Sequence, residues 1–127
     1  MRIFKTKWFT RFARQEGINT PELCEAIARA ERGLIDADLG GNVIKQRIAR
    51  PHEGRSGGFR SIVLFRAGER AVFVYGFAKN KRDNITQAEL RDFRDLAQTL
   101  LAYTDAQIQT ALDTETLSEV ECHDQDL

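Results

Sequence analysis

Residues 59–79, FRSIVLFRAGERAVFVYGFAK, decide the fold of this 127-residue chain. Two runs of β-branched and aromatic residues, 59–66 and 71–79, flank the turn sequence Ala67-Gly68-Glu69. This pattern predicts an antiparallel β-hairpin, because such side chains suit a pleated sheet and a short glycine-containing turn reverses the chain. Alternate residues of a strand share a face. The first strand is therefore predicted to carry Arg60, Ile62, Leu64 and Arg66 together, and the second Phe73, Tyr75, Phe77 and Lys79.

The segments before the hairpin predict a strand, a helical hairpin and a second strand. Residues 2–6 alternate as a strand does, and the aromatic spacing in 7–15 indicates a helix that Gly17 ends. A second helix follows, with Thr20 as its N-cap and Pro21 at its first position. Gly33 stops that helix. Residues 39–49 then alternate apolar with basic side chains and predict a strand.

After the hairpin the chain predicts helices. Asn84 or Thr86 begins a helix with an apolar stripe to Leu101, and we favour Asp83 and Asn84 as its caps. Asp105 begins a shorter helix, and residues 117–121 predict an edge strand. The predicted fold class is α+β, a small and mostly antiparallel sheet with an N-terminal helical hairpin and a C-terminal helix packed on it.

Composition is that of one globular domain, with 42% hydrophobic and 30% charged residues. We expect a single domain over 1–121 and an acidic, mobile tail over 122–127. No apolar run approaches the roughly 20 residues that span a bilayer, and the start MRIFKTKWF lacks the apolar stretch of a signal peptide. A cytoplasmic location without membrane contact is therefore expected.

The two cysteines indicate neither a disulfide scaffold nor a metal centre. Cys24 lies within the second predicted helix and is interpreted as a small buried hydrophobe. Cys122 lies in the acidic tail beside His123 and Asp124, and three adjacent residues cannot all face one ion. No metal or other cofactor is expected.

Charge is unevenly distributed, although the formal net charge is zero. Residues 1–82 contain 17 Lys/Arg against 8 Asp/Glu, whereas residues 83–127 contain 2 against 11. The segment 45–82 alone carries 10 basic and 2 acidic residues. Such asymmetry within a small domain indicates a positive surface for a polyanion.

If the central strands are neighbours, their basic residues converge on one sheet surface. The residues concerned are Lys45, Arg47, Arg60 and Lys79. Clustered guanidinium and ammonium groups suit RNA phosphates, and Tyr75 and Phe77 either offer a stacking surface or belong to the core. In RNA cleavage the 2′-OH attacks the adjacent phosphorus, so the protein must accept a proton, stabilise the charged transition state and protonate the leaving oxygen.

Four ordered blocks of this sequence resemble the RelE/HigB superfamily of bacterial type II toxins, and most closely its phage-like HigB branch. They are DADLGG, the K-x-R of Lys45 and Arg47, G-x-S-G-G-x-R ending at Arg60, and FVYGFAK ending at Lys79. The opening KTKWF and the helix from Thr86 fit as well, so the resemblance covers about residues 2–121. It implies a small RelE-like ribonuclease that cuts mRNA at the 70S ribosome. It also implies inhibition by a cognate antitoxin, often a helix-turn-helix DNA-binding protein.

The resemblance also implies residue roles. Arg60 and Lys79 would act at the scissile phosphate, Lys45 or Arg47 at the base step or at flanking phosphates, and Arg82 in support. Several such toxins place a histidine or tyrosine near the C-terminal end of the sheet, where this chain offers acidic residues and His123. The identity of the general base therefore stays open, with His52 as a weak substitute.

The segment GRSGGFRS (54–61) precedes the hairpin and is not a nucleotide-binding P-loop, because G-x-x-x-x-G-K-[ST] is absent and a strand follows it. Its glycines are predicted to turn the chain and admit RNA, while Arg55 and Ser56 add phosphate contacts. Two alternatives to a ribonuclease remain open: a non-catalytic nucleic-acid-binding protein of the same fold, and a ParE-like inhibitor of DNA gyrase.

Overall fold

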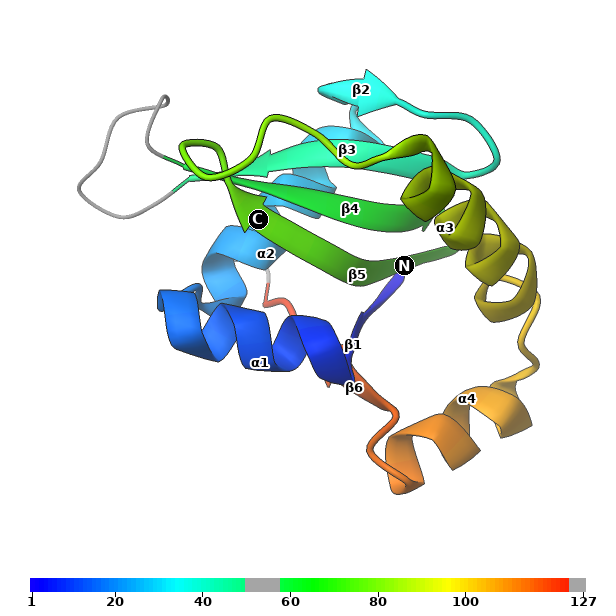
Figure 1. The fold of residues 1–127 in the computed structure, drawn as a ribbon. Helices are drawn as coiled ribbons and strands as arrows, with labels where there is room; N and C mark the ends of the chain where they lie inside the picture. The colour runs from blue at the N-terminus through cyan, green and yellow to red at the C-terminus, as the bar shows by residue number, and fades with distance from the viewer. Residues whose placement is uncertain (50–57, 124–127) are drawn as a thin grey trace.

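A computed structural model describes residues 1–49 and 58–123 and shows a mixed sheet with helices on both faces (Figure 1). Within these residues the sheet has six strands in the order β2-β3-β4-β5-β1-β6. Neighbouring strands are antiparallel, except that β1 runs parallel to β5. The strands are β1 (Arg2–Thr6), β2 (Ala37–Asp38), β3 (Val43–Ile48), β4 (Phe59–Arg66), β5 (Arg70–Ala78) and β6 (Leu117–Val120). The α+β prediction is confirmed.

Two helices cover each face of the sheet. On one face, α1 (Lys7–Glu16) and α2 (Thr20–Glu31) bury Phe9 and Leu23 against Ile48 and Phe73. On the other face, the apolar residues of α3 (Gln87–Leu100) and α4 (Asp105–Asp113) pack against side chains that include Val43 and Leu64. None of the described helices is long and apolar enough to cross a membrane.

The predicted cap of α2 is wrong, and for α3 the alternative Thr86 is confirmed over the favoured Asp83 and Asn84. The N-cap of α2 is Asn19 rather than Thr20, and that of α3 is Thr86 rather than Asp83 or Asn84. At both ends a glutamate three positions after the cap completes a capping box, with Glu22 and Glu89 accepting hydrogen bonds from the cap backbone. Several adjacent residues of capping type compete at each start, and the glutamate spacing selects among them.

A β-bulge corrects the predicted faces of β5. The register with β4 shifts between Ile62, which pairs with Tyr75, and Val63, which pairs with Phe73. Because the extra residue reverses the alternation, Phe73 faces α1 and α2 while Tyr75 packs against the opposite cluster. The predicted face is therefore wrong for Phe73, whereas Tyr75 and Phe77, which follow the bulge, do share a face.

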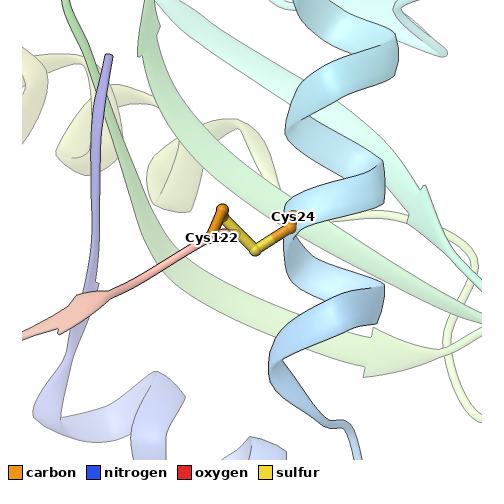
Figure 2. The surroundings of a disulfide bond; sticks show 2 residues. All are labelled: Cys24 and Cys122. Carbon is orange, nitrogen blue, oxygen red and sulfur yellow. A yellow bond between two sulfur atoms is a disulfide. The ribbon is translucent and has the colours of Figure 1, made fainter. Parts of the chain in front are cut away.

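A disulfide joins the two cysteines, which the sequence analysis treated separately (Figure 2). Cys24 of α2 bonds to Cys122, with a Cα–Cα distance of 5.8 Å across a sequence separation of 98 residues. Cys24 is buried as predicted, but as half of a covalent link. The link holds the chain just after β6 to α2, at the first residue of the segment predicted to be a mobile tail.

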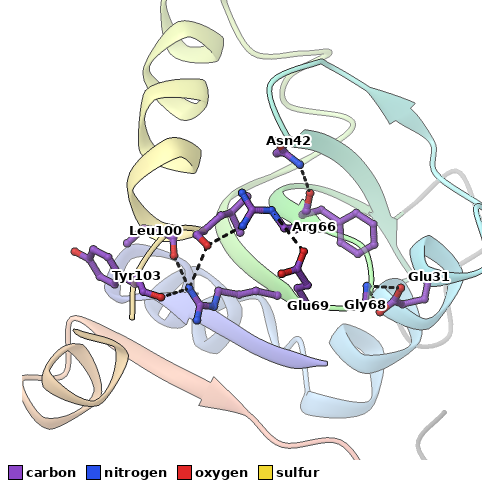
Figure 3. Close-up of polar contacts among 10 residues, drawn as sticks. Glu31, Asn42, Arg66, Gly68, Glu69, Leu100 and Tyr103 are labelled. Carbon is purple, nitrogen blue, oxygen red and sulfur yellow. Dashed lines mark hydrogen bonds and ion pairs between the residues drawn. The ribbon is translucent and has the colours of Figure 1, made fainter. Parts of the chain in front are cut away.

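Two arginines of the hairpin cap the C-terminal end of α3 (Figure 3). Arg70 Nη1 donates to the carbonyl oxygens of Leu100 at 2.9 Å and Tyr103 at 3.0 Å, and Arg66 Nη1 donates to that of Leu101 at 3.1 Å. The last carbonyls of a helix lack intrahelical partners and carry partial negative charge. These two members of the basic segment therefore fix α3 to one end of the sheet.

Candidate nucleic-acid interface

On the face that carries α3, the candidate site lies beyond that helix, at the end of the sheet where β3 and β5 finish and β4 begins. There Arg47 lies directly opposite Arg60, which lies opposite Phe77. One step along the sheet, Lys45 is opposite Ile62 and Ile62 is opposite Tyr75. The structure thus brings Lys45, Arg47 and Arg60 together on one surface, as the alternation predicted.

The two arginines are like charges on neighbouring strands, and each leaves one buried nitrogen without a hydrogen-bond partner among the described residues. Arg60 is only 9% exposed, and the nitrogens concerned are its Nη1 and the Nε of Arg47. Burial lowers the pKa of Arg60, and the neighbouring charge of Arg47 lowers it further. Buried donors without acceptors are costly. An anion placed between the two guanidinium groups would relieve both the repulsion and the missing acceptors.

Asp36, which begins the DADLGG block but was not predicted as a site residue, holds Arg47 from the open edge of β3. Its Oδ2 accepts a hydrogen bond from the Arg47 N–H, while Arg29 of α2 donates to the Arg47 carbonyl oxygen. These side chains take the place of a neighbouring strand, because β2 pairs only with Ile44 and Lys45. The Asp36 carboxylate also acts to raise the pKa of Arg60, against the two lowering effects.

Gln46 is a second residue that sequence reasoning missed. It is fully buried, and its Nε2 donates to the carbonyl oxygens of Ala26 at 2.9 Å and Leu34 at 3.0 Å. Its Oε1 accepts from the Asp36 N–H at 3.1 Å. The sequence signal that could have revealed Gln46 is its polar amide at a position of β3 where the alternation is otherwise apolar. Gln46 ties α2 and the Asp36 segment to the strand that carries Lys45 and Arg47.

An aromatic group borders the arginine pair. Tyr75 stacks on Trp8 of α1, with ring centroids 4.6 Å apart, and lies 5.9 Å from Phe93 of α3 and 6.2 Å from Phe77. Trp8 is 42% exposed, Tyr75 is half-buried, and Phe77 is 6% exposed. Tyr75 and Trp8 thus offer partly open ring surface, whereas Phe77 is buried next to Tyr75.

The Arg82 side chain makes contacts within the protein. Its guanidinium pairs with Glu89 in the first turn of α3, donates to the Tyr75 hydroxyl at 2.9 Å and lies 5.9 Å from the centre of the Phe77 ring. Hydrogen bonds from Arg82 and from the Thr86 backbone lower the pKa of Glu89 to about 2, and the hydrogen bond that Arg82 donates to Glu89 is the main cause of a raised pKa at Arg82. This geometry fits the supporting role predicted for Arg82, because it joins α3 to the aromatic group.

The other predicted contacts lie at the same end of the sheet or outside the described residues. Lys79 is exposed and directly follows β5, whose last residue Ala78 pairs with Phe59. Arg55, Ser56 and His52 lie in residues 50–57 and outside the described part. Gly58, the last glycine of that stretch, stands against β3, and a Cβ there would come within 2.6 Å of the Ile48 carbonyl oxygen. Glycine is therefore required at position 58 because the backbone there approaches β3 closely.

Comparison with known families identifies the class of protein. A family model described as RelE toxin of the RelE / RelB toxin-antitoxin system matches residues 1–120. A search of curated proteins finds no match. The match spans nearly the whole chain, including every strand and helix given above. The chain is a toxin of the toxin–antitoxin class, and it belongs to the RelE family. Membership implies an antitoxin as partner.

Proposed function

We propose that this toxin is an endoribonuclease that cleaves mRNA, and that it does so at the ribosome to stop translation. The observation that carries the proposal is the arginine pair, in which the half-buried Arg47 lies opposite the buried Arg60 and one nitrogen of each lacks a partner among the described residues. Such a pair suits the scissile phosphate, whose negative charge increases when the 2′-OH attacks and the phosphorus becomes five-coordinate.

The proposed roles follow from position. Arg60, held within the sheet, forks onto the phosphate, and Arg47 stabilises the charge that develops on it. Lys79, at the same end of the sheet, neutralises or protonates the leaving 5′-oxygen. Arg47 is poorly suited as a base, because a guanidinium keeps its protons in proteins. Lys45, one step from the pair on the same face, is the proposed proton acceptor.

Contacts away from the phosphate complete the proposed RNA site. Tyr75, with Trp8 beside it, supplies a stacking surface, and the buried Phe77 next to Tyr75 supports it. Arg82 positions Tyr75 through the hydroxyl contact. Arg55 and Ser56 remain proposed phosphate contacts. On the sequence blocks given above, we also propose that the chain belongs to the phage-like HigB branch, acts in the cytoplasm and is inhibited by a helix-turn-helix antitoxin.

Induction in a bacterial host tests the function. The wild-type chain is expected to arrest growth and to leave discrete cuts within translated messages, mapped by primer extension, while Arg60→Ala does neither. Arrest without cuts would contradict the proposal and favour a gyrase inhibitor. Folded protein that causes no arrest would favour a non-catalytic nucleic-acid-binding protein.

A further inference from the structure

A second basic surface lies away from the arginine pair, in a groove of about 410 Å³ between α1 and β6. Its charged lining consists of Lys7, Arg11 and Arg14 from α1 and of Glu115, which precedes β6. Thr10 and Ser118 add hydroxyl groups. None of these residues belongs to the proposed cleavage site.

The three α1 cations are uncompensated. They recur at positions i, i+4 and i+7, so they project from one side of the helix. All three are exposed, and within the described residues none of them makes an ion pair. Like charges at this spacing destabilise a helix by about 0.2–0.5 kcal/mol per pair. The spacing therefore costs stability, and of the three cations only Arg14, in the last turn of α1, is favoured by the helix dipole.

The surroundings add to the positive potential. Lys7 stands in the first turn of α1, where the helix dipole disfavours a cation, and no acidic residue accompanies it there. Lys5 of β1 lies opposite Ser118 in the sheet, at the groove. Burial lowers the pKa of Lys5, and the charge of Arg14 adds to that effect. Against the three cations of its lining the groove presents the single carboxylate of Glu115.

We propose that this groove binds the phosphodiester backbone of RNA at a position distant from the cleaved bond. Lys7 to Arg14 span about 10 Å of helix axis at about 1.5 Å per residue. That length corresponds to about three phosphate steps of a stacked strand at about 3.4 Å each. The hydroxyl groups of Thr10 and Ser118 can donate to phosphate oxygens, and phosphate takes bidentate contacts from arginine.

The groove is connected to the cleavage site through α1. Trp8, next to Lys7 in the chain, is 42% exposed and stacks on Tyr75 beside the arginine pair. An RNA strand that leaves the arginine pair across these aromatic rings reaches α1. Aromatic groups next to basic groups, as on this helix, are typical of sites that bind single-stranded nucleic acid. The inference rests on the proposed ribonuclease function and adds a second contact with the same RNA.

The test is the salt dependence of binding to a fluorescent 20-nucleotide 2′-O-methyl RNA, which the 2′-OH mechanism cannot cleave. Each phosphate contact on a single strand contributes about −0.7 to the slope of log K against log salt. The variant Arg11→Gln/Arg14→Gln is therefore expected to reduce the slope by about 1.4. The control, Arg32→Gln/Arg91→Gln, removes the same charge from exposed positions elsewhere and leaves the slope unchanged.

A cleavable four-nucleotide message, supplied on ribosomes because the proposed cleavage takes place there, separates this inference from the proposed function. The groove variant is expected to cut it at the wild-type rate, because the groove holds only longer RNA. The inference would be overturned by an equal change of slope in the groove and control variants, or by no change in either. Loss of cleavage in Arg60→Ala alone would, in that case, still support the proposed function. Loss of antitoxin binding with an unchanged RNA slope would assign the groove to a protein partner instead. If wild-type protein cuts no RNA, the proposed function fails, but the difference in slope still decides the groove.

Discussion

The same three strands, β3, β4 and β5, present two very different faces. Toward α1 and α2 they bury Ile44, Ile48, Phe59 and Phe73, each at most 3% exposed, in a continuous apolar core. Toward the other side the cover is partial. Apolar residues meet α3 at one end, and the arginine pair occupies the other.

The contrast shows how a small sheet supplies stability and a binding site from the same residues. Phe59, Arg60 and Ser61 are consecutive, and their side chains alternate between the core and the arginine surface. Burial of Phe59 and the hydrogen bond from the Ser61 hydroxyl to the Gln46 carbonyl oxygen hold the backbone on either side of Arg60. A binding group positioned by its own packed neighbours loses little freedom when it binds an anion.

The largest effect is expected when the covered face is broken. Phe73 is fully buried, with its ring 5.0 Å from that of Phe9, and Phe73→Ala should cost about 3–5 kcal/mol of unfolding free energy by leaving a cavity. Phe93→Ala, on the half-buried flank of α3, should cost about 1 kcal/mol. Urea unfolding of both variants measures the difference, and similar costs would mean that the two faces are packed alike.

A second prediction separates the two ends of the other face. Arg60→Ala should lower the cleavage rate by about 10²–10³, through loss of a transition-state contact, without lowering the melting temperature. Arg66→Ala, on the same strand and face, should instead cost about 1 kcal/mol of stability, because Arg66 caps α3, and should leave the rate within about twofold. Single-turnover kinetics and calorimetry on the two variants would contradict this division if both lost activity equally.

The disulfide gives the next effect. Reduction, or Cys122→Ser, should lower the unfolding free energy by about 2–4 kcal/mol, since the bond closes a long loop in the unfolded chain. The rate of RNA cleavage should change little, because neither cysteine lies on the arginine surface. Thermal unfolding with and without reductant tests this, and Cys122→Ser should itself be insensitive to reductant.

The smallest effect concerns pH. Glu89 has a pKa of about 2 in the folded protein against an ordinary value of 4.5, so folding favours its ionised form. Its contribution is therefore complete above about pH 4.5 and is lost as pH falls toward 2. The melting temperature of Glu89→Gln should lie below that of the wild type at pH 6 and approach it near pH 2. A constant difference across that range would show that the Arg82 contact has no electrostatic part.

Regular patterns allowed much of the fold to be predicted from sequence. The hairpin, the alternation of β3 and the ends of α1 all follow from local chemistry, and Gly17 takes the left-handed conformation expected at a C-cap. The cross-strand placement of Arg47 and Arg60 followed because β3 and β4 are joined along the chain. The parallel pairing of β1 with β5 did not, since no local signal specifies partners so distant in sequence.

The remaining features depend on tertiary contacts. The bulge at Val74 depends on the register of two whole strands, and two cysteines 98 residues apart carry no mark of their proximity. Asp36 and Gln46 act at the open edge of β3, where Asp36 binds the Arg47 N–H and Gln46 binds the Asp36 N–H. This edge can be recognised only once β2 is known to be short. Residues of ordinary type in an unusual position are the ones that a linear pattern does not reveal.

The covalent link also determines how the molecule would respond to a pulling force. A force applied between the two ends of the chain stretches only the residues before Cys24 and after Cys122, because the sulfur–sulfur bond bears the load for everything between. The intervening residues would add about 320–350 Å of contour length, at about 3.3–3.6 Å per residue. That extension appears only after reduction. A machine that unfolds proteins by drawing them through a narrow pore would thus meet a closed loop rather than a single strand.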